Sequence, residues 1–172
     1  MGCTTTKSSV DKALELRQKL INAQGCTFDV SITADYVESI YTFEMQCSVD
    51  QSNNLNFTVT QPDTISGISG LINLDQSHFT FDDKMLIFST ISDGQISPVS
   101  APWVFINALK NGYIRASSQT SGGYTVYVDD SYKENALELE ILIDVNDSPV
   151  SADIHWQGRR ILALRISNFV IL

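Results

Sequence analysis

Few residues of this chain are of the types that perform chemistry. Its 172 residues include two histidines, His78 and His155, and three cysteines. Neither histidine stands at a metal-ligand spacing from a cysteine or from the other histidine. The acidic pairs Asp82-Asp83 and Asp129-Asp130 fall at predicted turns, and the sequence has no nucleophile elbow and no phosphate-binding glycine loop. We therefore expect no enzymatic activity, no cofactor and no metal site.

Cys3 is of a type and in a position that could carry a lipid. It follows Gly2 and precedes a polar run of threonine, lysine and serine. The Gly-Cys pair resembles the end of a bacterial lipoprotein signal peptide, whose removal leaves the cysteine as the acylated first residue. The first six residues also fit the pattern of glycine myristoylation, with Cys3 available for a second acyl chain. Both interpretations predict a membrane anchor at Cys3 and a tether over residues 1–8; a third is a cysteine in a disordered leader.

The composition limits the remaining possibilities. With 43% hydrophobic and 18% charged residues, the chain is long enough for one well-buried domain, which we expect over residues 9–172. No apolar run approaches the roughly 18 residues of a membrane span, so membrane attachment would depend on Cys3. The net charge of -9 opposes binding to phosphate backbones and to anionic lipid head groups. We therefore expect no nucleic-acid partner.

Cys26 and Cys47 lie in two segments whose apolar residues alternate. Such alternation predicts two adjacent strands, each with one apolar face. The apolar positions are Cys26, Phe28, Val30, Ile32 and Ala34 in the first segment and Tyr41, Phe43, Met45, Cys47 and Val49 in the second.

The spacing of these two strands also permits a disulfide. If the chain reverses through a two-residue loop after Asp35, Val30 lies opposite Phe43 and Cys26 lies opposite Cys47. The two apolar faces then coincide, and so do the two cysteines. A Cys26–Cys47 disulfide would stabilise the fold by roughly 3 kcal/mol in an oxidising compartment. The alternative is two buried free thiols.

The rest of the chain has the pattern of one helix followed by many short strands. A capping-box motif begins at Ser8 and Gly25 stands beyond the last apolar position, which predicts an amphipathic helix over residues 9–23. Short alternating segments separated by turn residues then predict an antiparallel meander. These segments cover residues 55–59, 67–74, 79–81, 85–88, 137–145, 151–156, 160–166 and 169–172.

Residues 101–112 break the strand pattern. Pro102 suits a first helical turn and Gly112 follows the last apolar residue, which predicts a helix of about ten residues. Apolar residues cover nearly its whole circumference, so protein must cover the helix on both sides. Either the helix plugs the open end of a curved sheet beneath loops such as residues 89–100, or it lines a cavity for an apolar ligand.

Together these features resemble a known superfamily. The cysteine at position 3, the N-terminal amphipathic helix, the long meander, the central apolar helix and the closing run of residues 152–169 (ADIHWQGRRILALRISNF) are similar to the LolA/LolB-type lipoprotein carriers. More narrowly, they resemble the lipoproteins of Gram-positive bacteria that share this fold. The resemblance implies a mainly β fold with α-helices (α+β). In that fold a curved antiparallel half-barrel of about nine to eleven strands has a concave face closed by the N-terminal and central helices.

The resemblance also implies where a ligand would lie. Members of the superfamily hold lipid or lipoprotein acyl chains against the concave face. Mapped onto this sequence, the face would be formed by Phe28, Val30, Ile32, Tyr41, Phe43 and Met45, and the lid by Trp103, Phe105, Ile106 and Leu109.

Two functions follow from the resemblance as expectations. The first is an extracytoplasmic lipoprotein, anchored to the bacterial cell membrane, that binds or carries a lipid or another apolar ligand. The second is an anchored structural or regulatory module that recruits another envelope protein, for example in spore germination, and holds no ligand. LolA itself is a soluble shuttle without a lipid anchor, so an anchored protein departs from it.

Overall fold

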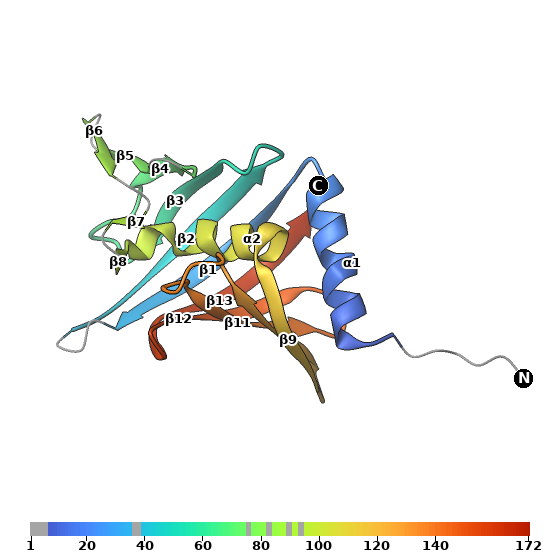
Figure 1. Ribbon diagram of the computed structural model, residues 1–172. Helices are drawn as coiled ribbons and strands as arrows, with labels where there is room; N and C mark the ends of the chain where they lie inside the picture. Colours follow the sequence, from blue (N-terminus) through green and yellow to red (C-terminus); the bar gives the residue numbers. More distant parts are fainter. Residues whose placement is uncertain (1–6, 36–38, 75–76, 82–83, 89–90, 93–94) are drawn as a thin grey trace, which may run out of the picture.

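The protein forms one curved antiparallel sheet with two helices on its concave side (Figure 1). The computed structural model describes residues 7–35, 39–74, 77–81, 84–88, 91–92 and 95–172. Cys3 and most of the predicted tether lie outside these residues. Among the described elements, neither helix has the length and apolarity needed to cross a lipid bilayer.

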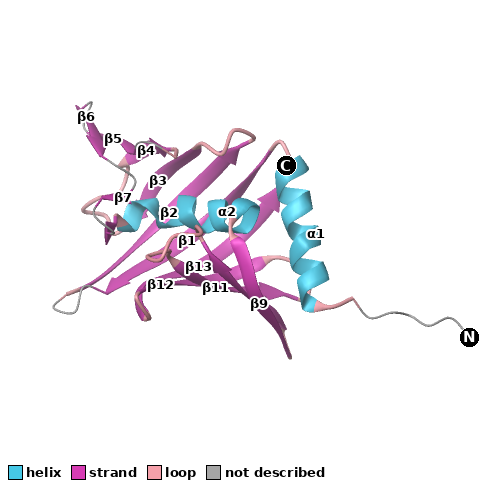
Figure 2. Cartoon of the chain, viewed as in Figure 1, coloured by secondary structure: helices cyan, strands magenta, loops and turns pink. Residues whose placement is uncertain are grey.

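The chain begins with a helix and continues as a meander, as the sequence predicted, but residues 113–120 and 123–129 form two strands that it did not predict (Figure 2). The helices are α1 (Ser9–Asn22) and α2 (Ala101–Asn111), preceded by a 3-10 turn at Pro98–Ser100. The strands are β1 (Gly25–Asp35), β2 (Ile40–Asp50), β3 (Leu55–Gln61), β4 (Ser69–Ile72), β5 (Ser77–Phe81), β6 (Lys84–Phe88), β7 (Ile91–Ser92), β8 (Gln95–Ile96), β9 (Tyr113–Thr120), β10 (Gly123–Asp129), β11 (Glu138–Asp144), β12 (Pro149–Trp156) and β13 (Arg159–Ile171).

The described strands form an eleven-stranded sheet that stays open. Its order is β6-β5-β4-β3-β2-β1-β13-β12-β11-β10-β9, and β7 pairs with β8 in a separate ribbon. Neighbours in the sheet are also neighbours in sequence, except at the centre, where β1 pairs with β13. This architecture confirms the expected α+β class and the curved half-barrel.

The β1–β2 hairpin corrects one prediction. Ile32 lies opposite Phe43 and Phe28 lies opposite Cys47, so the expected register is wrong by two residues. The reason is the connection: β1 ends at Asp35 and β2 begins at Ile40, which leaves more than two residues for the turn. A shift of two keeps every side chain on its face, so the apolar faces still coincide.

The same shift separates the two cysteines. Cys26 lies opposite Val49 and Cys47 lies opposite Phe28, so the pairing on which the predicted disulfide depended is not formed. Both cysteines are buried free thiols in the structure. Cys26 and Cys47 therefore match the alternative interpretation, two buried thiols in the core.

Helix α1 begins and packs as its sequence pattern indicates. The Ser8 hydroxyl accepts a hydrogen bond from the Asp11 backbone N–H at 3.2 Å, and the Asp11 carboxylate accepts one from the Ser8 N–H at 3.2 Å. This reciprocal capping box satisfies two donors at the helix start. The buried positions Ala13, Leu16 and Leu20 recur at helical spacing and join the common core.

Helix α2 lies across the concave face of the sheet and is buried nearly all round (Figure 1). On one side the Phe105 ring meets the Phe28 ring of β1 edge to face, with centroids 5.9 Å apart. At its start the indole Nε1 of Trp103 donates to the Asn53 carbonyl in the β2–β3 turn at 2.9 Å. Helix α1 also contacts α2. The predicted covering on both sides is therefore present.

Arg17 of α1 closes the C-terminal end of α2. Its Nε donates to the Leu109 carbonyl at 2.7 Å, and its Nη2 donates to the Gly112 carbonyl at 2.8 Å and to the Ala108 carbonyl at 3.4 Å. The last carbonyls of a helix lack intrahelical donors and carry partial negative charge, so a guanidinium there satisfies both needs. Arg17 thereby joins the two helices.

Replacing Arg17 with methionine should keep the side-chain stem and remove these hydrogen bonds. We expect the free energy of unfolding to fall by about 2–3 kcal/mol, because buried carbonyls lose charge-assisted donors. Urea denaturation followed by circular dichroism measures it. Arg159→Met is the matched control: its exposed ion pair with Asp35 at 3.2 Å should contribute less than about 1 kcal/mol. Equal losses in the two variants would contradict the role given to Arg17.

Candidate functional site

The predicted ligand-facing side chains lie together between the sheet and α2. Strands β1 and β2 direct alternate side chains toward the helix, and α2 directs its own toward the sheet. Nine of the ten predicted residues are buried, and the most exposed of the nine, Phe43, is 8% exposed. These nine are Phe28, Val30, Ile32, Phe43, Met45, Trp103, Phe105, Ile106 and Leu109.

Tyr41 is the exception among the ten. It shares the face of Phe43 by alternation, but it stands near the start of β2 and is 58% exposed. The other nine are covered by protein atoms and pack against one another in the core between the sheet and α2. The loop over residues 89–100, expected to cover α2, falls partly outside the described residues.

Burial also decides the chemistry of the two thiols. Burial raises the pKa of Cys26 to about 11. Burial raises the pKa of Cys47 as well, and the neighbouring carboxylate of Asp29 adds to that rise. The thiolate is the reactive form of cysteine, so both side chains are protonated and unreactive at neutral pH.

A chain carrying Cys3→Ser should therefore react slowly with a thiol reagent at pH 8 while folded, and its two remaining thiols should react promptly in urea. The folded-state rate for Cys26 should rise about tenfold per pH unit toward pH 11, because the thiolate fraction rises with pH below the pKa. Intact mass spectrometry of the alkylated protein counts the sites. A non-reduced mass two hydrogens short would instead reveal a Cys26–Cys47 disulfide.

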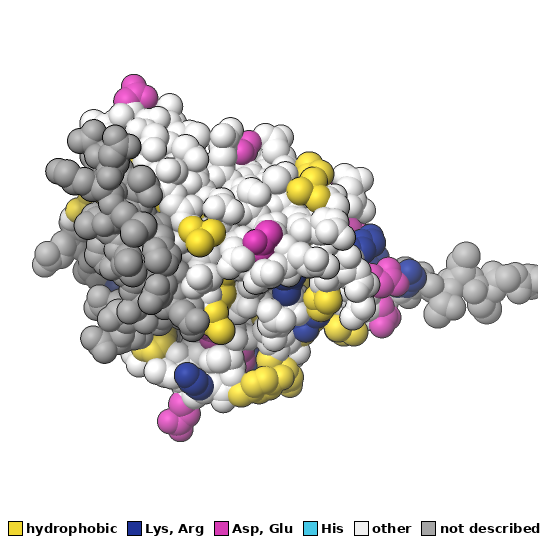
Figure 3. Space-filling view, turned by 90° about the horizontal axis from the view of Figure 1, so that it is seen from above, with side chains coloured by type: hydrophobic (Ala, Val, Ile, Leu, Met, Phe, Trp, Pro, Cys, Tyr) yellow, Lys and Arg dark blue, Asp and Glu magenta, His cyan; other side chains and the backbone are white. Residues whose placement is uncertain are grey.

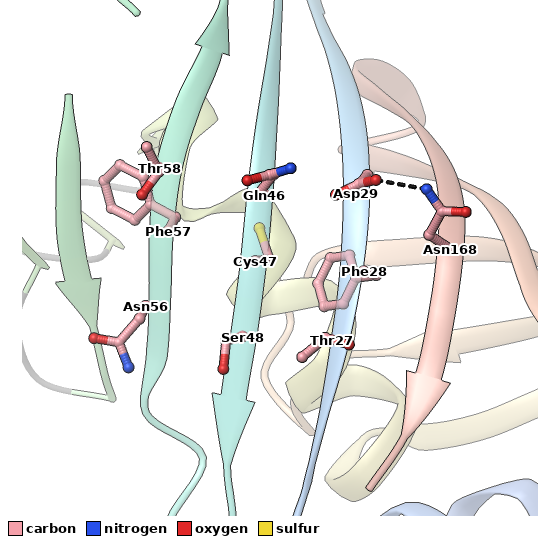
Figure 4. Close-up of a pocket in the computed structure, with 10 residues that line it drawn as sticks. All are labelled: Thr27, Phe28, Asp29, Gln46, Cys47, Ser48, Asn56, Phe57, Thr58 and Asn168. Atoms are coloured by element: carbon pink, nitrogen blue, oxygen red, sulfur yellow. Dashed lines mark hydrogen bonds between the residues drawn. The ribbon is translucent and has the colours of Figure 1, made fainter. Parts of the chain in front are cut away.

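The hollow surface of the molecule lies on the opposite side of the sheet. We call the sheet face turned away from α1 and α2 the outer face. A cavity of about 400 Å³ opens there across β3, β2, β1 and β13 (Figure 4). Its lining consists of Thr27, Phe28, Asp29, Gln46, Cys47, Ser48, Asn56, Phe57, Thr58 and Asn168. A second cavity of about 370 Å³ shares Asp29 and Gln46 with the first, and we name the two together the outer-face groove.

A bulge in β13 shapes this groove. Pairing between β1 and β13 shifts between Thr27 and Asp29, and Asn168 adopts a left-handed backbone with φ 52°. The Asn168 amide donates to the Asp29 carboxylate at 2.7 Å. The next residue, Phe169, stacks on the Phe28 ring with centroids 5.7 Å apart. The bulge thus turns one side chain into the groove and its neighbour onto the core.

The sequence interpretation missed this groove. The polar side chains of the groove alternate with the apolar ones along each strand, and this pattern predicts only a strand face exposed to solvent. The signal that could have indicated it is asparagine itself, which adopts left-handed backbone more readily than most residues. In a strand, such an asparagine is typical of a bulge.

Charged residues gather on the outer face over strands β9, β11, β12 and β13. Arg115 pairs with Glu138 at 3.1 Å, and Arg160 pairs with Asp153 at 3.2 Å. A cavity of about 230 Å³ lies beside them, and His155 contributes to its lining. Among the described residues, no three His, Cys, Asp or Glu side chains gather as a metal site would require.

Two exposed tyrosines lie beside the end of α2. Tyr113 begins the edge strand β9 directly after Gly112, and its ring centroid is 5.6 Å from that of Tyr132. The two side chains are 49% and 88% exposed. We call this pair the tyrosine patch. On the face seen from above, by contrast, hydrophobic side chains form small separate groups (Figure 3).

Comparison with known proteins supports the fold. No protein-family model matches the chain, and neither does any curated protein sequence. Among solved structures, an uncharacterized conserved protein from Thermus thermophilus matches with a TM-score of 0.52 and 10% identity, covering 96% of this chain and 88% of that one. A DUF1329 family protein from Desulfovibrio piger matches with a TM-score of 0.51 and 8% identity, covering 95% and 91%.

A third solved structure matches over a similar share of the chain. A proposed outer membrane lipoprotein-sorting domain from Vibrio parahaemolyticus matches with a TM-score of 0.50 and 8% identity, covering 94% of this chain and 91% of that one. Identity this low shows a shared architecture alone. The comparison therefore supports the overall fold of the chain and assigns it no family.

Proposed function

We propose that this protein is an extracytoplasmic lipoprotein with a LolA-like fold that acts by recruiting another envelope protein. The observation that carries the proposal is the filled interior: nine of the ten side chains placed at the ligand site are buried in the core. An acyl chain between the sheet and α2 would have to displace them, at the cost of core packing.

Lipid carriage is the alternative. It is favoured by the structural likeness to a lipoprotein-sorting domain. A fold does not fix a function, however, because one scaffold hosts many sites. The packing around Phe105 and Phe28 weighs against the alternative.

The tyrosine patch is the surface we propose for the partner. Exposed tyrosines contribute large contact area at low entropic cost and are enriched among the residues that dominate binding. Tyr113 also stands at the start of the edge strand β9. Pairing of β9 with β10 shifts next to Arg115, so this end of the edge is irregular and less suited to bind an added strand. Side-chain contacts with the tyrosines would therefore dominate.

The same proposal has three further parts. The chain is anchored through Cys3, its source is a Gram-positive bacterium, and its role is binding and not catalysis. Anchoring would hold the folded part of the chain close to the membrane, since Ser8 already caps α1. The net charge of -9 would keep the surface from adhering to anionic head groups. A partner within the same membrane or wall layer fits this arrangement.

Native mass spectrometry distinguishes the two functions. The full chain carrying Cys3→Ser, which removes any covalent lipid, is incubated with a bacterial polar lipid extract and compared with its denatured mass. We expect the bare chain in both spectra, because the site between sheet and α2 is filled. A bound lipid mass that disappears on denaturation would overturn the proposal in favour of a carrier.

Photocrosslinking in intact cells of the source organism tests the tyrosine patch. A photoreactive phenylalanine derivative at Tyr132 should yield one discrete protein adduct, because that side chain is 88% exposed beside Tyr113. In the matched control the photoreactive derivative replaces Tyr41, an exposed tyrosine on β2. This variant should yield no such adduct. Absence of an adduct at Tyr132, or the same adduct at both positions, would contradict the assignment.

A further inference from the structure

We propose that the outer-face groove binds a neutral, hydroxyl-rich glycan segment. The proposal starts from the kinds of side chain that line its larger cavity. Three carboxamides, three hydroxyls and one carboxylate face it from four neighbouring strands (Figure 4). They are Gln46, Asn56 and Asn168; Thr27, Ser48 and Thr58; and Asp29.

This set matches the hydrogen-bonding needs of a sugar. A carboxamide offers both donors and acceptors, a hydroxyl offers one donor and two acceptors, and a carboxylate accepts only. Sugar hydroxyls likewise donate and accept together. Of the side chains drawn in Figure 4, those of Asn168 and Asp29 are joined by a hydrogen bond, at 2.7 Å. The Gln46 and Asn56 side chains are exposed on the same face, so their amides can meet a ligand there.

The backbone also gives the groove a defined shape, in addition to its polar lining. Asn168 reaches it because β13 bulges and places that residue in left-handed backbone. Bulges of this kind redirect side chains and are frequent beside functional sites. The hydrogen bond to Asp29 then fixes both side chains in one orientation. Phe169, stacked on Phe28, holds the other half of the bulge against the core.

Charge selects a neutral ligand over an anionic one. Asp29 is the charged residue of the larger cavity, while Glu44 and Arg165 in the adjoining cavity carry opposite charges. The groove therefore has one negative charge in excess, on a protein whose net charge is -9. A phosphate-bearing or uronate polymer would be repelled, and so would an anionic head group.

Dimensions favour a chain of sugars over a single one. The two cavities of about 400 and 370 Å³ adjoin at Asp29 and Gln46 and run across four strands. Each has the size of an ordinary small-molecule site. An oligosaccharide occupying both would contact Thr58 in one and Arg165 in the other. This binding is independent of the tyrosine patch, which lies at another end of the sheet.

Amide chemical-shift mapping of the full Cys3→Ser chain tests the inference. The probes are three neutral oligosaccharides, chitotetraose, cellotetraose and maltotetraose, at millimolar concentrations. We expect at least one to shift the amides around Asp29, Gln46, Asn56 and Asn168. Asn168→Gly, which keeps left-handed backbone accessible, should weaken that binding about tenfold because it removes one amide from the ligand and frees Asp29.

The controls separate a site from general surface effects. Thr42→Val changes a polar outer-face residue outside both cavities and should leave the affinity unchanged. No shifts with any of the three probes, or unchanged affinity in Asn168→Gly, overturns the proposal. Stronger binding of hyaluronan, an anionic glycan, than of the neutral probes overturns the charge argument and the proposal with it.

Discussion

The structure depends on a central helix that needs protein around nearly all of its surface. Apolar residues cover nearly the whole circumference of helix α2, and exposing either half would cost the burial of several large side chains. The curved sheet covers one half and meets it through Phe28. Helix α1 packs beside it, and Arg17 satisfies the carbonyls at its end. The curved sheet and α1 together cover the apolar surface of α2.

The protein's own side chains meet this requirement between the sheet and the helix. The sheet face that remains hollow is the polar one, where alternation leaves amides and hydroxyls outward. Binding chemistry on this scaffold is thus available at its outer surface and at its edge, while its centre provides stability.

Local sequence patterns predicted the two helices well. They predicted the pairing between strands less well. The capping box at Ser8 and the apolar circumference of residues 101–112 are local signals, and both helices formed where those signals stand. The hairpin register depended on the length of a turn, which alternation does not specify; Val30 therefore meets Met45 and not Phe43. The bulge at Asn168 depends on contacts between the first and last strands, which no window of sequence contains.

The central pairing of β1 with β13 has a consequence for how the chain acquires its structure. Without β13, the strands from β6 to β1 and those from β12 to β9 share no ladder of hydrogen bonds. The two halves of the sheet therefore become one continuous sheet only when β13 pairs with β1, although the two helices also pack between them. Contacts between residues so distant in sequence make folding slow, because the chain must close a long loop before this central pairing can form.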